Sequence, residues 1–397
     1  MFAPSAGLRR GALALVAVLL VWAAFAAFTR GTLVMALGGR FDFTPSLIGA
    51  AAFWAGESPY TAAVTLRVQQ AMFGGALPAG EDEQRVAHPA YTAVLIAPLL
   101  LVSPEMAIAL WSSLQLLLLI CTPFLWLSIF GWSPKPLLAA ALLLSLLLLY
   151  RYPIIIYVLG QFVGTVLFGF SLAIWCLRRG HRAWAGAALV LCMMPPSYGA
   201  ALVALALVGE VVRGRWRAAL VFCGLMGAVT LFSVARIGWW LPDWLATLNA
   251  YREYANPYFP LGLLPSWGQL IIAALALAAL AWLTWRWLRA PSDETWQDFL
   301  CAALLVLALL LPQTGAYYLA CLMIVAIAAA MRIDRAPRGR WLGALLWLAF
   351  AASPWVWFLL PARDRTEVLF VPLAASLVWG WSRRDALRRA LSRNPRT

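Results

Sequence analysis

The stretch GALALVAVLLVWAAFAAF, residues 11–28, decides the fold class of this chain. It is apolar and uncharged, and a helix of about 20 such residues crosses the roughly 30 Å hydrocarbon core of a bilayer. Inside lipid, a helix satisfies all the backbone groups of its own segment. Similar runs recur along the 397 residues, of which 64% are hydrophobic and 12% charged, and the mean hydropathy is +0.83. We therefore predict an all-α, polytopic transmembrane protein.

The residues that flank this run set its orientation. Arg9 and Arg10 precede it, as in a signal peptide, but no clear cleavage motif follows. We predict an uncleaved first helix at about residues 11–35 that runs outward from a cytoplasmic N-terminus. Most of the 30 Lys and Arg residues fall in loops that we assign to the cytoplasmic face by the positive-inside rule. They include Arg213, Arg215, Arg286, Arg332 and Arg383, and we assign Asp298 to the same face. The net charge of +14 therefore reflects topology and attraction to anionic lipid headgroups, and it does not indicate a nucleic-acid partner.

Residues 36–103 form a large external loop in this topology. The charged stretch 40–43 opens it, and Thr44 and Pro45 then predict the N-cap and first turn of a helix that lies along the membrane surface. The stretch 89–102 is apolar but too short to cross a bilayer, so we expect it to be interfacial or re-entrant.

The remaining apolar runs predict the other spans, at about 104–130, 136–150, 160–177, 218–237, 263–285, 341–360 and 367–382. Two longer runs are broken, at Pro195-Pro196 and at Pro312-Gln313-Thr314-Gly315. Both have basic flanks, so each break predicts a hairpin of two short helices. The sequence thus predicts about twelve spans in a transmembrane domain, residues 1–382, and a basic cytoplasmic tail, residues 383–397.

The two broken hairpins and the large external loop lie on the same side of the membrane in this topology. Non-helical backbone at the edge of a membrane is tolerated where it lines a cavity. We therefore predict a site on the external face, at the level of the lipid–water interface.

The six cysteines all lie in apolar runs and show no paired spacing, which predicts small buried side chains. The sequence contains no metal-binding motif, P-loop, dinucleotide fingerprint or serine nucleophile elbow. We therefore predict no metal and no cofactor, and neither ATP-driven transport nor serine hydrolysis is favoured.

Several short motifs occur in an order that resembles one family of membrane enzymes. They are Asp42-Phe43, Gly56 with Pro59-Tyr60, His88-Pro89-Ala90-Tyr91, Ala97-Pro98-Leu99, Trp111, Gly160-Gln161, Arg178-Arg179-Gly180, Gly186 with Pro195-Pro196, Arg213-Gly214-Arg215-Trp216-Arg217-Ala218 and Pro312-Gln313-Thr314-Gly315-Ala316-Tyr317-Tyr318. Their order resembles glycosyltransferase family 87 of the GT-C superfamily, polyprenyl-phosphate-dependent enzymes that include the phosphatidylinositol-mannoside mannosyltransferases. The chain departs from the family pattern at Ser46, Met194 and Tyr317, which affects donor recognition more than the fold.

The resemblance implies inverting transfer of a hexose or pentose, mannose-like, from a polyprenyl-phosphate sugar donor to a glycolipid or lipid-linked glycan acceptor. It implies a protein of the cell (inner) membrane, in contact with membrane lipids, whose site faces the periplasm or exterior. A single displacement requires a base for the acceptor hydroxyl and groups that bind the leaving phosphate. It requires no covalent nucleophile on the enzyme.

The resemblance makes Asp42 the general base. The alternative is a local role, because an acid near the start of a helix gains roughly 0.3–1 kcal/mol from the helix dipole. Arg40 would keep this carboxylate ionised or contact phosphate; alternatively, it extends its guanidinium to the interface as other membrane arginines do.

Five further residues are expected to bind substrate. His88 and Gln161 would hydrogen-bond phosphate oxygens or sugar hydroxyls, while a capped loop residue and a packing residue are their respective alternatives. Tyr60, Tyr317 and Tyr318 would bind the sugar or the phosphate; alternatively, such aromatic residues anchor helices at the interface.

Two other classes of protein remain open from the sequence. A multi-pass transporter or a lipid or glycan flippase would also carry broken helices around a cavity. Such a protein usually has ionisable groups inside its spans, and we expect few here. A lipid-linked polymer ligase or polymerase would tend to place its large external loop late in the chain, whereas here it comes early.

Overall fold

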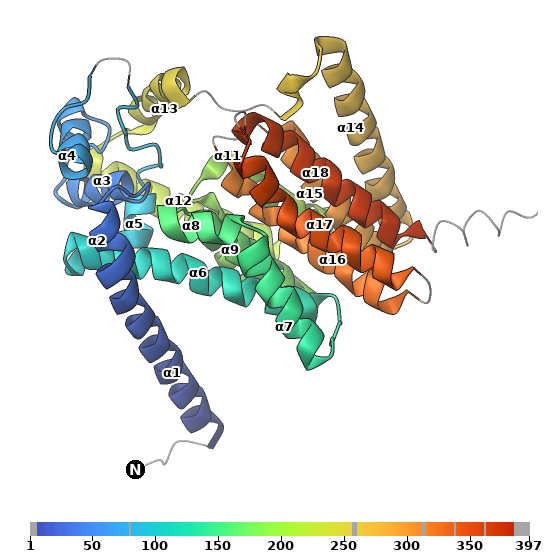
Figure 1. The fold of residues 1–397 in the computed structure, drawn as a ribbon. Helices are drawn as coiled ribbons and strands as arrows, with labels where there is room; N and C mark the ends of the chain where they lie inside the picture. Colours follow the sequence, from blue (N-terminus) through green and yellow to red (C-terminus); the bar gives the residue numbers. More distant parts are fainter. Residues whose placement is uncertain are drawn as a thin grey trace, which may run out of the picture. The chain divides into compact units, whose positions relative to one another are not determined.

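The structure is a computed structural model, which describes residues 6–78, 81–255, 260–311, 315–336, 339–360 and 363–384. Within these ranges every regular element is a helix, and none of these residues lies in a strand (Figure 1). The predicted all-α fold is confirmed.

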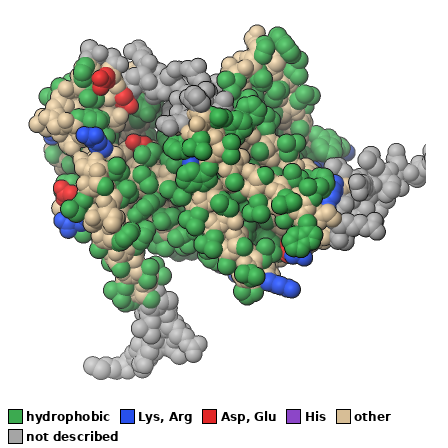
Figure 2. Space-filling view, viewed as in Figure 1, with side chains coloured by type: hydrophobic (Ala, Val, Ile, Leu, Met, Phe, Trp, Pro, Cys, Tyr) green, Lys and Arg blue, Asp and Glu red, His purple; other side chains and the backbone are tan. Residues whose placement is uncertain are grey.

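Six helices of the described chain are long and apolar enough to cross a membrane, namely Val16–Leu37, Pro104–Ile129, Arg217–Ile237, Ser266–Arg289, Ala316–Arg335 and Arg340–Phe358. Pro136–Leu149 and Tyr152–Leu159, which meet at a bend of 55°, add a seventh if they form one span. Apolar side chains cover much of the face shown in Figure 2, as lipid contact requires. The chain is a polytopic membrane protein. Twelve spans stay a prediction, because the other apolar helices have only 10–17 residues.

The chain forms two compact packing units. The first comprises the described parts of Met1–Leu118, Ile155–Phe162 and Gly227–Tyr254, and the second those of Leu119–Ile154, Val163–Met226 and Ala255–Thr397. Three helices pass from one unit to the other, namely α6 (Pro104–Ile129), α8 (Tyr152–Leu159) and α12 (Arg217–Ile237). The predicted basic tail lies outside the described residues from position 385 onward.

The first unit contains the first span and the predicted external loop. Its helices, besides parts of α6, α8 and α12, are α1 (Ala6–Thr29), a π-helical segment (Arg30–Val34), α2 (Met35–Leu37), α3 (Thr44–Trp54), α4 (Ala62–Phe73), α5 (Thr92–Ile96), a 3₁₀ helix (Ala97–Leu101) and α13 (Leu241–Ala255). The helix predicted to start near Thr44 is present as α3. The short apolar stretch 89–102 contains α5 and the 3₁₀ helix that follows it. Helices α4 and α13 were not expected from the sequence.

The role predicted for Thr44 is wrong. Helix α3 already includes Thr44, and no side chain caps its start. The Thr44 hydroxyl instead donates to the carbonyl of Gly39, at 2.7 Å, and so ties down the turn that precedes the helix. Helix α3 packs against α4 and α5, and most of its residues are buried.

The prediction that the cysteines are buried holds for four of the six. Cys176, Cys192, Cys301 and Cys321 are buried and Cys121 is intermediate, but Cys223 is exposed. Cys223 lies on α12, where only 11% of the apolar span is buried in the protein. Its surroundings would therefore be lipid and not other side chains.

The second unit is a bundle of helices from the later part of the chain. Besides parts of α6, α8 and α12 it contains α7 (Pro136–Leu144) with a π-helical segment (Ser145–Leu149), α9 (Val163–Arg178), α10 (Arg182–Val190), a 3₁₀ turn (Leu191–Met193), α11 (Pro196–Val212), a 3₁₀ turn (Pro260–Leu263), α14 (Ser266–Arg289), α15 (Asp293–Leu310), a 3₁₀ helix (Ala316–Leu322), α16 (Met323–Arg335), α17 (Arg340–Phe358) and α18 (Arg363–Ser382). Helices α16, α17 and α18 lie side by side (Figure 1).

The predicted helix break at Pro195-Pro196 is present. The helical path stops before Pro195 and α11 starts at Pro196, because proline lacks the backbone donor that a continuing helix needs. A side chain at Gly199 of α11 would overlap the carbonyl of Cys192, so glycine allows α11 to approach the segment before the break closely. Residues 312–314 of the second break lie outside the described residues.

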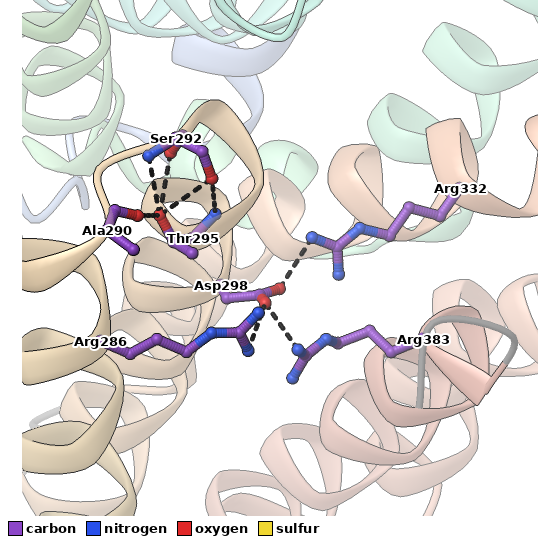
Figure 3. Close-up of polar contacts among 7 residues, drawn as sticks. All are labelled: Arg286, Ala290, Ser292, Thr295, Asp298, Arg332 and Arg383. Atoms are coloured by element: carbon purple, nitrogen blue, oxygen red, sulfur yellow. Dashed lines mark hydrogen bonds and ion pairs between the residues drawn. The ribbon is translucent and has the colours of Figure 1, made fainter. Parts of the chain in front are cut away.

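A buried carboxylate joins four helices of the second unit. Asp298 of α15 has no exposed surface. Arg332 of α16 and Arg383, which follows α18, lie 2.8 and 2.6 Å from its oxygens, and Arg286 of α14 lies 4.0 Å away (Figure 3). The sequence predicts all four residues on the cytoplasmic face, and that orientation stays a prediction.

We expect Asp298→Asn to lower the free energy of unfolding by about 3–5 kcal/mol, because three arginines lose the carboxylate that compensates them. Asp293→Asn is the matched control: Asp293 pairs with Arg178, but its side chain is 72% exposed, so the loss should stay below about 1 kcal/mol. Denaturant unfolding of the purified protein measures both. Equal losses would contradict a structural role for Asp298.

Candidate functional site

Asp42 lies between two anchored aromatic residues. Phe41 and Phe43 are both fully buried, whereas Asp42 is exposed. The ring of Phe43 stacks on Trp111 with centroids 4.7 Å apart and also contacts Phe162. Because the backbone is held on both sides, the carboxylate of Asp42 has a fixed position at the surface.

The turn between α8 and α9 holds the backbone of Asp42. The amide of Asp42 donates to the carbonyl of Leu159, at 3.0 Å, and the indole of Trp111 donates to the carbonyl of Gly160, at 2.8 Å. Gly160 has a φ of +69°, which glycine adopts without strain. A Cβ there would lie 3.1 Å from the Cβ of Phe43, closer than ordinary van der Waals contact, so a side chain would have to displace Phe43 slightly.

Gln161 follows this turn and reaches the carboxylate directly. Its side-chain amide donates to Oδ2 of Asp42. Gln161 is itself buried, with 9% of its surface exposed, so its amide is held in place. The structure therefore brings together two residues that the sequence analysis singled out separately, 119 positions apart.

The surroundings raise the pKa of Asp42 from 3.8 to about 6. The main cause is loss of hydration, because neighbouring protein atoms replace water around a carboxylate that is still accessible. The amide of Gln161 opposes this by stabilising the ionised form, and the charge of Asp82 adds to the rise. Arg40 is exposed and, within the described chain, forms no ion pair with Asp42; its predicted role in keeping this carboxylate ionised stays a prediction.

His88 lies against the same aromatic group. Its ring centroid is 4.2 Å from that of Phe162, and its Nδ1 lies 2.9 Å from the hydroxyl of Ser46. Burial lowers the pKa of His88 to about 4, so the imidazole is neutral near pH 7. When the hydroxyl of Ser46 donates to Nδ1, Nε2 carries the proton and is a donor.

Tyr60 holds the segment that carries His88. Its hydroxyl donates to the main-chain carbonyl of His88, at 3.0 Å, and its ring lies near Trp240. Trp244 donates to the carbonyl of the preceding residue, Ala87, at 2.9 Å. Tyr60 therefore has a structural partner, while its predicted contact with substrate stays a prediction.

The remaining predicted residues belong to the second unit. Tyr317 and Tyr318 lie in the 3₁₀ helix after the second break, with their ring centroids 4.9 Å apart, and Tyr318 also packs on Tyr198. Their predicted contacts with substrate stay predictions. Arg151, also in this unit, is 4% exposed and pairs with the buried Glu367, at 3.1 Å.

The site thus combines an accessible carboxylate that titrates near pH 6, an amide that orients it and a neutral imidazole. Such a carboxylate can accept a proton from a hydroxyl, and a neutral imidazole can donate a hydrogen bond to an oxygen anion. Sequence reasoning gave Phe162 no role, although its aromatic ring directly follows Gly160-Gln161. The sequence marked Ser46 only as a departure from the family pattern, because nothing local pairs its hydroxyl with His88.

We expect Gly160→Ala to lower the free energy of unfolding by about 1–3 kcal/mol and to disturb the contact between Asp42 and Gln161. Gly74→Ala is the matched control: its φ is +80°, but a Cβ there meets no atom within 4 Å. It should cost only the backbone strain of about 1–2 kcal/mol. Thermal unfolding compares the two. A smaller loss for Gly160→Ala than for Gly74→Ala would show that the turn tolerates a side chain.

Comparison with known proteins identifies the family. The model of the family described as Glycosyltransferase family 87 matches residues 87–312, which is more than half of the chain. His88 and Gln161 lie within this match, whereas Asp42 precedes it. No curated protein and no solved structure matches the chain. With its membrane-spanning helices, the chain belongs to glycosyltransferase family 87 and is a membrane glycosyltransferase.

Proposed function

We propose that Asp42 is the general base of this glycosyltransferase. The observation that carries the proposal is an exposed carboxylate, oriented by the amide of Gln161, with a pKa of about 6. A base is most effective when its pKa lies near the working pH, because it is then ionised and still basic enough to take a proton. Asp42 also follows the first span, which ends at Leu37, so a substrate with its tail in the bilayer would reach it.

The donor in this proposal is a polyprenyl-phosphate sugar, with a mannose-like hexose or a pentose, and the acceptor is a glycolipid or lipid-linked glycan. The acceptor hydroxyl gives its proton to the Asp42 carboxylate while its oxygen attacks the anomeric carbon. The bond from that carbon to the phosphate oxygen breaks, and polyprenyl phosphate leaves with the electron pair. A single displacement inverts the configuration of the sugar and needs no enzyme nucleophile.

The leaving phosphate needs hydrogen-bond donors or positive charge. Neutral His88 supplies an N–H group when Ser46 donates to its other nitrogen, and the exposed Arg40 supplies a cation nearby in sequence. Tyr60 acts here as a positioning residue, because its hydroxyl already binds the carbonyl of His88.

We place this reaction on the external face of the cell (inner) membrane. The support is the distribution of basic residues in the sequence, which assigns the loop that carries Asp42 to the outside. Membership of an enzyme family removes the main reason to consider a transporter or flippase.

We expect Asp42→Asn to lower sugar transfer by on the order of a hundredfold or more, because the amide cannot take the proton. Transfer of radiolabelled sugar from polyprenyl-phosphate donors into membrane glycolipid measures this. Glu81→Gln is the matched control, an exposed acid of the same region whose loss should leave transfer nearly unchanged. If the Asp42 variant matches the wild type, another group is the base.

The same substitution should not unfold the protein. A carboxylate whose pKa is raised by folding holds its proton more tightly in the folded state, so it reduces stability as the pH rises from about 4 to about 6. Replacing it with neutral asparagine removes that penalty above pH 6. The variant should therefore express as well as the wild type and unfold at no lower temperature, which is the condition for the activity comparison.

We expect the pH dependence of kcat/KM to report the pKa of Asp42. The rate should rise with pH below about 6, where the carboxylate loses its proton, and level off above it. Gln161→Leu removes the donor that stabilises the ionised form, so the midpoint should move to higher pH. If the midpoint does not move, Gln161 does not influence the ionisation that controls the rate.

A further inference from the structure

A cavity of about 380 Å³ lies in the second unit, where α9, α11, the end of α14 and the start of α15 meet. This volume is in the range of ligand-binding pockets. Its lining joins apolar surface, including Leu205, Trp287 and Phe299, to charged side chains. The charged lining residues are Arg178, Glu210, Arg213, Arg215 and Asp293.

Two of these arginines lie over tryptophan rings. The guanidinium carbon of Arg213 is 4.7 Å from the ring centroid of Trp287, and that of Arg178 is 5.0 Å from that of Trp296. Arg213 also donates to the carbonyl of Gly209, at 2.8 Å. A side chain at Gly209 would overlap the Trp287 ring, so glycine keeps this arrangement open. The cations are therefore held at the cavity by cation–π contacts and hydrogen bonds.

Positive charge is in excess at the cavity. Asp293 pairs with Arg178, and Glu210 pairs with Arg182, at 2.7 Å, and with Arg215, at 3.5 Å. Within the described part of the chain, Arg213 has no carboxylate partner. A cavity with such an excess attracts an anion.

The apolar part of the lining indicates that the anion carries a lipid tail. Helix α14 ends at the cavity with Trp287, and only 6% of its apolar span is buried in the protein, so its flank faces lipid. Tryptophan and arginine at the end of a span mark the headgroup level of a membrane. Basic pockets between transmembrane helices bind the headgroups of anionic phospholipids.

We propose that this cavity binds the phosphate headgroup of an anionic membrane phospholipid, with Arg213 and Arg215 at the phosphate and the apolar lining against the acyl chains. The sequence assigns these arginines to the cytoplasmic face, so the lipid belongs to the inner leaflet. This site is separate from Asp42 and does not depend on the proposed reaction.

The test uses the full-length protein, purified and delipidated in detergent, with native mass spectrometry to count retained ligands. The probes are phosphatidylglycerol, phosphatidylcholine with the same acyl chains, and glycerol 3-phosphate as a free phosphate. We expect retention of phosphatidylglycerol over the other two. No preference for phosphatidylglycerol would overturn the proposal, and retention of glycerol 3-phosphate to the same extent would assign the cavity to a soluble phosphate instead.

Arg213→Gln should weaken phosphatidylglycerol binding about fivefold, as expected for the loss of one cation at the membrane surface. It leaves no carboxylate unpaired, so the fold should survive. Arg289→Gln is the matched control. The guanidinium carbon of Arg289, at the end of α14, also lies over a tryptophan ring, 4.8 Å from the centroid of Trp285, but Arg289 does not line the cavity. Equal losses in the two variants would mean general surface attraction and would overturn the site.

Gly209→Ala provides a second test that changes no charge. The added methyl group would push against Trp287 and Arg213 inside the cavity. We expect it to reduce phosphatidylglycerol retention while the thermal midpoint shows a folded protein. A folded Gly209→Ala variant that retains the lipid as the wild type does would contradict binding in this cavity.

Discussion

The left-handed turn at Gly160 is the constraint on which the candidate site depends. It presents the carbonyl of Leu159 to the amide of Asp42 and places the amide of Gln161 at the carboxylate. Trp111 fixes the turn through the Gly160 carbonyl. Because the neighbours of Asp42 are held in this way, its carboxylate loses hydration while it stays accessible, and its pKa rises to about 6.

The acids of this chain differ in their environment, and the environment distinguishes the acids that stabilise helix packing from the acid that can take part in a reaction. Asp298 and Glu367 are fully buried, and each is paired with arginine, so their charges are fixed in helix packing. Asp42 is exposed, has no arginine partner among the described residues and has an amide donor instead. Only such a carboxylate can exchange a proton with an incoming substrate.

The sequence predicted much of the fold and part of the candidate site. It placed the break at Pro195, because proline acts locally, and it placed Asp42 just after the first span. It assigned the wrong role to Thr44, because the carbonyl of Gly39 competes for that hydroxyl only in the folded turn. It did not predict α4 and α13, because their polar residues are typical of loops and their helical packing is evident only in the folded first unit.

The amino-acid pattern alone is enough to assign the membrane class, the helical fold and the membership of glycosyltransferase family 87. These properties depend on apolar runs and on motif order, which are present before any distant residues meet. Which residues act on Asp42, and how its pKa shifts, became clear from the folded chain. That outcome depends on contact between segments 119 positions apart, and loss of hydration exists only after they have packed.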